Sequence, residues 1–181
     1  MLAILFIIFG LVSSFSFNKK PPKINNIGRN SLNEVNELTK QLNGYGYLST
    51  LGYINKLKGI PQTSLVGFCI DENKFPLLSM ANISMHYRNI QKNNSVSLLI
   101  TEPTIQSATQ KRVLFTGKLN EISNNEFDYY KELYKKYHTN AHWIDYIDLN
   151  FYRMDEILQI FYVGGFSSAT QISISKYLNK S

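Results

Sequence analysis

Cysteine and histidine are scarce in this chain of 181 residues. The single cysteine, Cys69, excludes an intrachain disulfide and lies in the apolar run 65–70, so we expect a buried, unreactive thiol. Of the three histidines, His138 and His142 are four residues apart, but Thr139-Asn140 interrupts any helix there and no third ligand is evident. We therefore expect no metal site, because protein metal sites use three or four ligands.

Two sequence patterns are also missing. No G-x-S-x-G sequence occurs, so we do not expect the chemistry of an α/β-hydrolase. A regular alternation of strands and helices is absent too, which argues against a doubly wound parallel sheet. No internal repeat and no linker follow residue 33, and this favours a single domain after that point.

Acidic residues are absent from the first 33 residues, which contain Lys19, Lys20, Lys23 and Arg29. These four cations account for most of the formal net charge of +6, because the rest of the chain carries 15 basic and 13 acidic residues. A nucleic-acid-binding protein should carry its positive charge on its folded domain. We therefore expect no nucleic-acid partner.

The apolar run 2–12 is too short to cross a bilayer, which takes about 20 residues. It fits a secretory signal peptide over residues 1–16, with Ser14-Phe15-Ser16 as the cleavage pattern. A buried N-terminal helix is the alternative. After cleavage we expect no stable membrane anchor. Two glycosylation sequons, at Asn82 and Asn93, agree with secretion but leave their use open.

Residues 17–30 are basic, rich in asparagine and interrupted by Pro21-Pro22. Such a segment cannot bury enough apolar surface to fold alone, so it predicts a flexible leader. The leader resembles a transit peptide, although a plain flexible tail on a secreted protein would have the same composition. We expect localisation in the secretory pathway, as a secreted or endolysosomal protein, or alternatively in a plastid reached through a bipartite leader.

The folded domain is expected over residues 31–181. Ser31 and Glu34 form a capping box that predicts a helix ending at Asn43-Gly44. From Tyr45 onward the pattern is typical of short strands. We predict two further helices, over 84–92 and 123–137, and strands over 45–54, 63–70, 76–81, 95–101, 112–119, 149–152, 158–166 and 171–174.

Two adjacent glycines, Gly164 and Gly165, interrupt the strand pattern between Tyr162 and Ser167. A glycine pair inside a strand marks a bulge, or a place where a backbone or ligand comes very close. We expect a bend at a barrel corner here. Together the elements predict a mainly β fold, an antiparallel β-barrel with a few short helices, because closure hides the strand edges.

Several landmarks then occur in order along the chain. They are Leu48-Ser49-Thr50-Leu51, Pro61 with Ser64, Leu78-Ser79, His86-Tyr87-Arg88-Asn89, Ser97-Leu98-Leu99, Arg112-Val113 with Gly117, and Tyr162-Val163-Gly164-Gly165-Phe166. The ordered set resembles the split-barrel proteins of the pyridoxamine 5′-phosphate oxidase-like superfamily. Within it, the set is most similar to the group that includes the CREG glycoproteins and the HugZ-type haem-degrading proteins.

This resemblance covers residues 31–175 and carries several expectations. It implies a six-stranded antiparallel split barrel of the FMN-binding type. It implies a homodimer with two equivalent pockets at the dimer interface, each able to hold FMN or haem, and an oxidoreductase or haem-related role. The alternative is a non-enzymatic secreted or endolysosomal CREG-like protein that has lost its cofactor. A plastid regulator of tetrapyrrole metabolism is a third interpretation.

The resemblance also selects cofactor-binding residues, although no catalytic residue is assigned. In the flavin oxidases an Arg-Lys pair binds the FMN phosphate, and here the matching residues are Met85 and His86. A phosphate requires charge-assisted donors, so other cations and hydroxyls must serve. The predicted set is Ser49, Thr50, Ser79, His86, Arg88, Asn89, Lys111, Arg112, Gly164 and Gly165.

The HugZ-type proteins carry a further C-terminal region with an axial histidine for haem. The present chain ends at Ser181, shortly after the last predicted strand, so we expect it to lack that region. On this interpretation an axial ligand has to come from His86, His138 or His142.

Overall fold

The computed structural model describes residues 28–41, 43–145 and 148–179. The predicted signal peptide (1–16) and most of the predicted leader (17–30) lie outside these ranges. Within them, no helix is long and apolar enough to cross a membrane.

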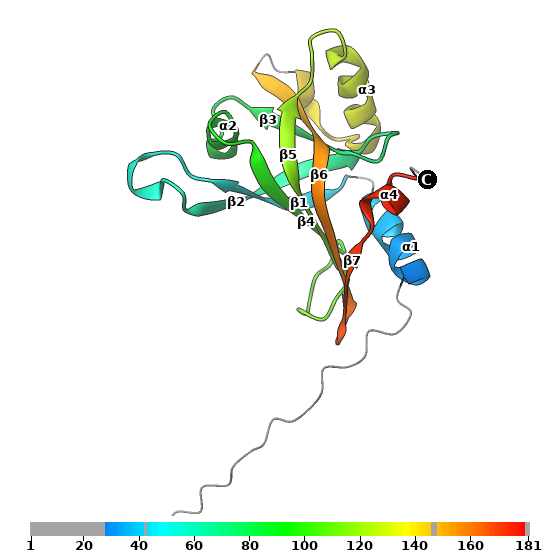
Figure 1. The fold of residues 1–181 in the computed structure, drawn as a ribbon. Helices are drawn as coiled ribbons and strands as arrows, with labels where there is room; N and C mark the ends of the chain where they lie inside the picture. The colour runs from blue at the N-terminus through cyan, green and yellow to red at the C-terminus, as the bar shows by residue number, and fades with distance from the viewer. Residues whose placement is uncertain (1–27, 42, 146–147, 180–181) are drawn as a thin grey trace, which may run out of the picture.

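Seven strands form one antiparallel sheet in the order β3-β2-β1-β4-β5-β6-β7, and β3 also pairs with β6. This pairing closes the first six strands into a barrel and confirms the predicted six-stranded fold, with β7 as an additional strand (Figure 1). The strands are β1 (Tyr45–Leu51), β2 (Pro61–Ile70), β3 (Pro76–Ala81), β4 (Ser95–Thr101), β5 (Arg112–Glu121), β6 (Leu149–Gly165) and β7 (Ser168–Ile172).

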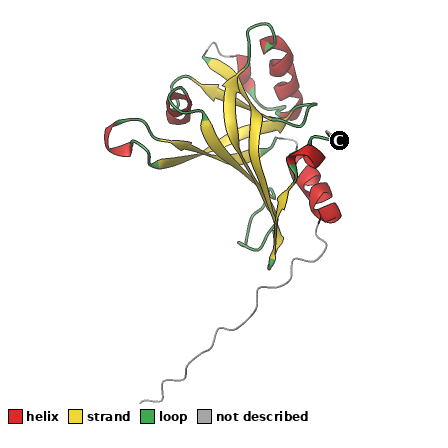
Figure 2. Ribbon diagram, in the orientation of Figure 1, coloured by secondary structure: helices red, strands yellow, loops and turns green. Residues whose placement is uncertain are grey.

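The helices are short, as Figure 2 shows in red. They are α1 (Gly28–Thr39), α2 (Met85–Ile90), α3 (Phe127–Tyr137), α4 (Ile174–Tyr177) and the 3₁₀ turns η1 (Asn55–Leu57) and η2 (His142–Asp145).

The barrel interior is filled by side chains that alternate along each strand. In β5, for example, Val113, Phe115 and Leu119 are buried while Leu114 and Thr116 are only partly covered. Ile90 from α2, and Val35 and Leu38 from α1, join this interior core.

A second, smaller core lies between the outside of the barrel and α3. There Tyr130 and Tyr134 of α3 pack with Leu77 of β3 and Phe151 of β6. This packing covers one side of the barrel, and it explains why the predicted amphipathic helix forms.

Several sequence-based boundaries were wrong. α1 begins at Gly28, so Ser31 lies inside the helix instead of capping it. The predicted strands 149–152 and 158–166 are one strand, β6, of 17 residues. The predicted last strand, 171–174, is displaced: β7 ends at Ile172, and the short helix α4 begins at Ile174.

The continuity of β6 has a structural reason. The polar run Arg153 to Glu156 suggested a break, but Met154 in its middle is fully buried. Two register shifts against β5, at Thr116/Gly117 and Lys118/Asn120, let the strand bend without ending.

The predicted bulge at the glycine pair is confirmed. The pairing of β6 with β7 shifts register between Val163 and Gly165, and Gly165 has a φ of +137° that an L side chain rarely adopts. The pair ends β6 and leads into a tight hairpin at Phe166 and Ser167, which extends away from the barrel beside the β4–β5 loop (Figure 1).

Candidate functional site

The outer face of β1, β2, β4, β5 and β6 carries a continuous apolar row. Direct pairing places Tyr47 between Leu65 and Leu99, and it places Leu114 between Leu99 and Phe161. These five side chains point away from the interior core, since the residues on either side of each along its strand are buried, apart from Ser64 before Leu65. Leu65 is 62% exposed and Tyr47 is 40% exposed.

A row of hydroxyl groups runs beside the apolar row, and on each strand it lies two residues away from the apolar side chain. The hydroxyls of Ser49 and Thr63 lie 3.1 Å apart, and those of Ser97 and Thr116 lie 3.2 Å apart. Ser49 also pairs directly with Ser97, so the four groups cross β2, β1, β4 and β5 in sequence. The face therefore combines an apolar band with a band of neutral donors and acceptors.

Two cations stand on the same face at opposite ends of β5, since Arg112, Leu114, Thr116 and Lys118 alternate with buried residues. Arg112 donates through one guanidinium nitrogen to the carbonyls of Ala108 (2.5 Å) and Gln110 (3.3 Å). Lys118 forms an ion pair of 2.9 Å with Glu156. Glu156 neutralises Lys118 through both carboxylate oxygens, whereas the guanidinium of Arg112 has further N–H donors for an anionic group on this face.

A cavity of about 270 Å³ opens at one end of the apolar row. Tyr45, Tyr47 and Leu65 form the sheet side of its wall, and Pro103 and Ile105 from the β4–β5 loop form part of the rest. Gln41, Asn43, Thr101 and Glu102 complete the lining, so the cavity combines apolar side chains with polar groups, as ligand sites do.

The structure places Thr50 and Asn89 inside the molecule instead of on this face. Asn89 donates from Nδ2 to Oγ1 of Thr50 at 2.9 Å, and both side chains are buried. Their bond ties α2 to β1 directly behind Ser49. His86 and Arg88 lie on the same short helix, where burial lowers the pKa of His86 and Arg88 is exposed.

The other predicted residues are divided between two places. Ser79 lies under α3 and hydrogen-bonds the hydroxyl of Tyr134, away from the apolar row. Lys111, Gly164 and Gly165 lie near Arg112, whose strand partner is Val163. Lys111 forms an ion pair of 3.1 Å with Glu34 of α1.

Glu34 also accepts a hydrogen bond of 2.5 Å from the hydroxyl of Tyr162. This bond, together with Lys111, lowers the pKa of the Glu34 carboxyl. Lys111 is therefore already neutralised by a structural partner.

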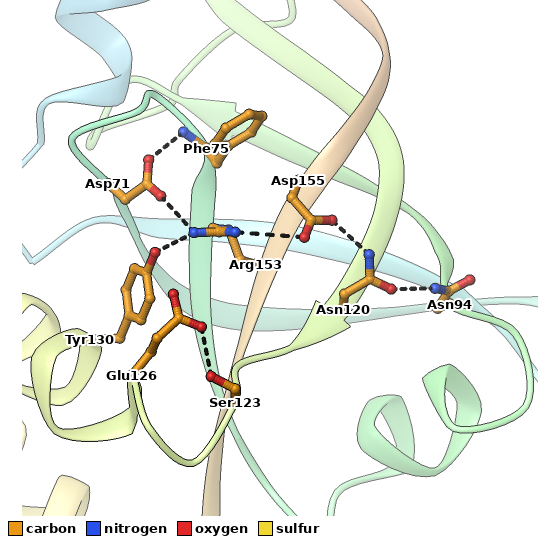
Figure 3. Close-up of polar contacts among 9 residues, drawn as sticks. All are labelled: Asp71, Phe75, Asn94, Asn120, Ser123, Glu126, Tyr130, Arg153 and Asp155. Atoms are coloured by element: carbon orange, nitrogen blue, oxygen red, sulfur yellow. Dashed lines mark hydrogen bonds and ion pairs between the residues drawn. The ribbon is translucent and has the colours of Figure 1, made fainter.

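A separate polar cluster surrounds Arg153, as Figure 3 shows. Its guanidinium lies 3.7 Å from the buried Asp71 and 3.8 Å from Asp155, and it also donates to the hydroxyl of Tyr130. The bonds continue from Asp155 through Asn120 to Asn94. Arg153 thus connects β6 with α3 and with the β2–β3 turn, which is a structural role.

Within residues 28–41, 43–145 and 148–179, no three His, Cys, Asp or Glu side chains are grouped closely enough to hold a metal ion. His138 is buried, and its Nε2 lies 2.8 Å from the carbonyl oxygen of Phe68. Because a carbonyl only accepts, Nε2 carries the proton, and the neutral ring stacks on Tyr134 at 4.2 Å.

The sequence analysis missed Tyr45, Tyr47 and Lys118. The residues of β1 alternate between exposed and buried positions, and the two tyrosines are both at exposed ones. That signal was present, but it does not distinguish an open face from one covered by a helix.

The comparisons with known proteins agree with this architecture. The family model for the CREG β-barrel matches residues 37–179. An atypical chloroplastic heme oxygenase, HOZ of Arabidopsis thaliana, is 29% identical over 140 residues. That alignment covers 76% of this chain and 42% of HOZ, so the chain spans about two fifths of its relative.

Two solved structures of haem proteins have similar folds. A haem-binding protein from Mycobacterium smegmatis superposes with a TM-score of 0.66 and 21% identity, over 79% of this chain and 59% of that one. The haem storage protein HutZ from Vibrio cholerae gives 0.58 and 17%, over 75% and 96%.

A protein of the pyridoxinephosphate oxidase family from Clostridium acetobutylicum gives a TM-score of 0.59 at 17% identity, over 82% and 97%. The fold is therefore the split barrel of this superfamily. Since the family model covers most of the folded chain, the protein belongs to the CREG β-barrel family.

Proposed function

We propose that this protein binds haem on the outer face of β1, β2, β4 and β5, between two copies of the chain. The observation that carries the proposal is the apolar row from Leu65 to Phe161 with its parallel row of hydroxyls. HOZ, HutZ and the Mycobacterium smegmatis protein, which share the fold, are each named for haem.

The residues on this face fit the two chemical parts of haem. The macrocycle is a flat apolar disc, and Tyr47, Leu99 and Leu114 offer it a continuous apolar surface. The two propionates are anions, and they would be held by Arg112 and by the hydroxyl row. Bound haem supplies iron for oxygen and electron chemistry, and the protein supplies the orientation and the local charges.

FMN fits the described residues less well. Its phosphate carries two charges, but the α2 positions that hold it in flavin oxidases are Met85 and His86, and burial favours the neutral form of His86. Arg88 is the remaining cation of that helix. The same substitutions favour the second candidate, a CREG-like interaction protein without a cofactor, and a haem titration separates the two.

The proposal includes a homodimer because one chain alone leaves this apolar face exposed to solvent. Tyr45, Tyr47 and Leu65 remain 40–62% exposed, although apolar side chains of this size stabilise a protein when they are buried. A second copy related by a twofold axis would cover the row and the haem together.

The test combines the solution mass with a haem titration followed by absorption spectroscopy. We expect a dimer that binds haem saturably and gives no comparable response to FMN. Leu65→Asp, on the face, should weaken both dimerisation and haem binding. Ile83→Asp is the matched control, because Ile83 is 80% exposed in the turn before α2 and should change neither. A monomer, or a wild-type protein without a saturable haem spectrum, would contradict the proposal.

We also propose delivery into the secretory pathway, with the plastid as the alternative. The support is the apolar run 2–12 and the basic segment that follows it, and HOZ is described as chloroplastic. Residues 1–33 fused to a fluorescent reporter should direct it to one of these compartments, whereas a cytosolic reporter would contradict both.

A further inference from the structure

None of the three histidines of the chain is on a strand of the outer face that we assign to haem. His138 is buried, with Nε2 bonded to Phe68. His142 is in η2, which follows α3. His86 lies on α2, whose neighbouring side chain Asn89 is turned toward the interior. A haem on the outer sheet face would therefore need another axial ligand from this chain.

Tyr47 is the one side chain of the apolar row with a group that can bind iron. It occupies the row between Leu65 and Leu99. Side chains stand roughly perpendicular to a sheet, and tyrosine extends further than leucine. Tyr47 is 40% exposed and lines the cavity at this end of the row, so its hydroxyl is the iron-binding group nearest to that cavity on the row.

We infer that the phenolate oxygen of Tyr47 is an axial ligand of the haem iron, an inference that rests on the function proposed above. Tyrosinate is an established axial ligand of ferric haem. The phenol O–H bond breaks, its proton goes to solvent, and an oxygen–iron bond forms while the iron stays ferric.

Tyr129 provides a matched control. It lies on α3, is 49% exposed, and belongs neither to the apolar row nor to the lining of the cavity. Its ring meets that of Tyr130 edge-on, with the centroids 5.0 Å apart. Replacing either tyrosine with phenylalanine removes one oxygen atom and keeps the apolar surface, so both variants should fold.

The experiment compares ferric haem complexes of the wild type, Tyr47→Phe and Tyr129→Phe by absorption and resonance Raman spectroscopy. We expect tyrosinate vibrations in the wild type and in Tyr129→Phe. Tyr47→Phe should lose them and bind haem at least about tenfold more weakly, because loss of a ligand should cost no less than loss of a residue that supports one. Tyr47→His should bind haem with an imidazole-type spectrum, which a merely structural role of Tyr47 would not produce.

Two results would overturn the inference. If the wild type binds haem but Tyr47→Phe keeps the wild-type spectrum, Tyr47 is not the ligand and the proposed haem function stands. The same holds if His86→Ala alone removes the axial ligand. If the wild type binds no haem, the proposed function fails, and the inference fails with it.

Discussion

The amide nitrogen Nδ2 of Asn89 donates to the hydroxyl of Thr50 across 2.9 Å, and this buried bond joins α2 to β1. The sequence singled out both residues as cofactor ligands. Their burial gives them a structural role in the described chain, while their neighbour Ser49 is on the opposite side of the strand, in the hydroxyl row.

Replacing Thr50 with valine should destabilise the fold without changing haem affinity. Valine has nearly the same shape but leaves the Asn89 amide without its partner. An unpaired buried polar group costs about 1–3 kcal/mol. Urea unfolding measures this loss, and a haem titration provides the comparison. A Thr50→Val protein with wild-type stability and weakened haem binding would restore Thr50 as a ligand.

Replacing Arg153 with methionine should be more damaging. The Asp71 side chain is 2% exposed, and its carboxylate would lose its cation. Breaking such a pair should lower the free energy of unfolding by about 2–4 kcal/mol at pH 7. The double variant Asp71→Asn/Arg153→Met should recover part of this loss, because no buried charge remains. Additive effects of the two substitutions would show that the ion pair contributes nothing.

The same pair predicts a pH dependence for Arg153→Met. Burial raises the pKa of Asp71 above its unfolded value even with Arg153 present, so the folded protein favours the protonated acid. This preference stabilises the folded protein fully below pH 3.8, the pKa of Asp71 in the unfolded chain. The stabilisation is lost as the pH rises through the pKa of Asp71 in the folded protein. The variant should therefore be less impaired at pH 4 than at pH 7.

His138 predicts the opposite pH dependence. Burial lowers its pKa below the unfolded value of 6.5, against a smaller effect of the bond to Phe68. The contribution of His138 to the free energy of unfolding is therefore fully present above pH 6.5. It is lost as the pH falls through the pKa of His138 in the folded protein, by at most about 1.4 kcal/mol per pH unit.

Urea unfolding between pH 7.5 and 5 measures this slope. His138→Gln should flatten it, whereas His142→Gln, at an exposed position, should leave it unchanged. Equal slopes in the wild type and His138→Gln would show that His138 does not titrate as expected.

Replacing the two predicted arginines should have different effects on haem binding. Arg112 is on the face of the apolar row, whereas Arg88 is on α2. Arg112→Gln should weaken haem binding about tenfold and reduce its sensitivity to salt, because a charge-assisted contact to a propionate is lost. Arg88→Gln should do neither. The reverse result would place the anionic groups at α2.

The alternation of apolar residues was sufficient to predict most strands and the barrel. In β5 it assigned Val113 and Phe115 to one side and Leu114 and Thr116 to the other, as the structure confirms. It failed at β6, because Arg153 to Glu156 interrupts the local pattern. Pairing with β3 on one half and with β5 on the other holds this strand together, and those contacts come from distant parts of the chain.

The candidate site was harder to predict from the sequence than the fold. Of the predicted residues, Ser49 and Arg112 reach the shared face, whereas Thr50, Asn89 and Ser79 are packed into the barrel or under α3. A strand pattern shows that successive side chains point to opposite sides. It does not show which of those sides a helix will cover.

The sequence by itself determined the closed antiparallel barrel, the bulge at Gly164-Gly165 and the alternating sides of each strand, because local sterics and burial set these features. Only the tertiary structure decided that Leu65, Tyr47, Leu99, Leu114 and Phe161 stand in one row beside a row of hydroxyls. That arrangement depends on the register between strands far apart in the chain, and a shift of one residue would turn each of these side chains to the opposite face.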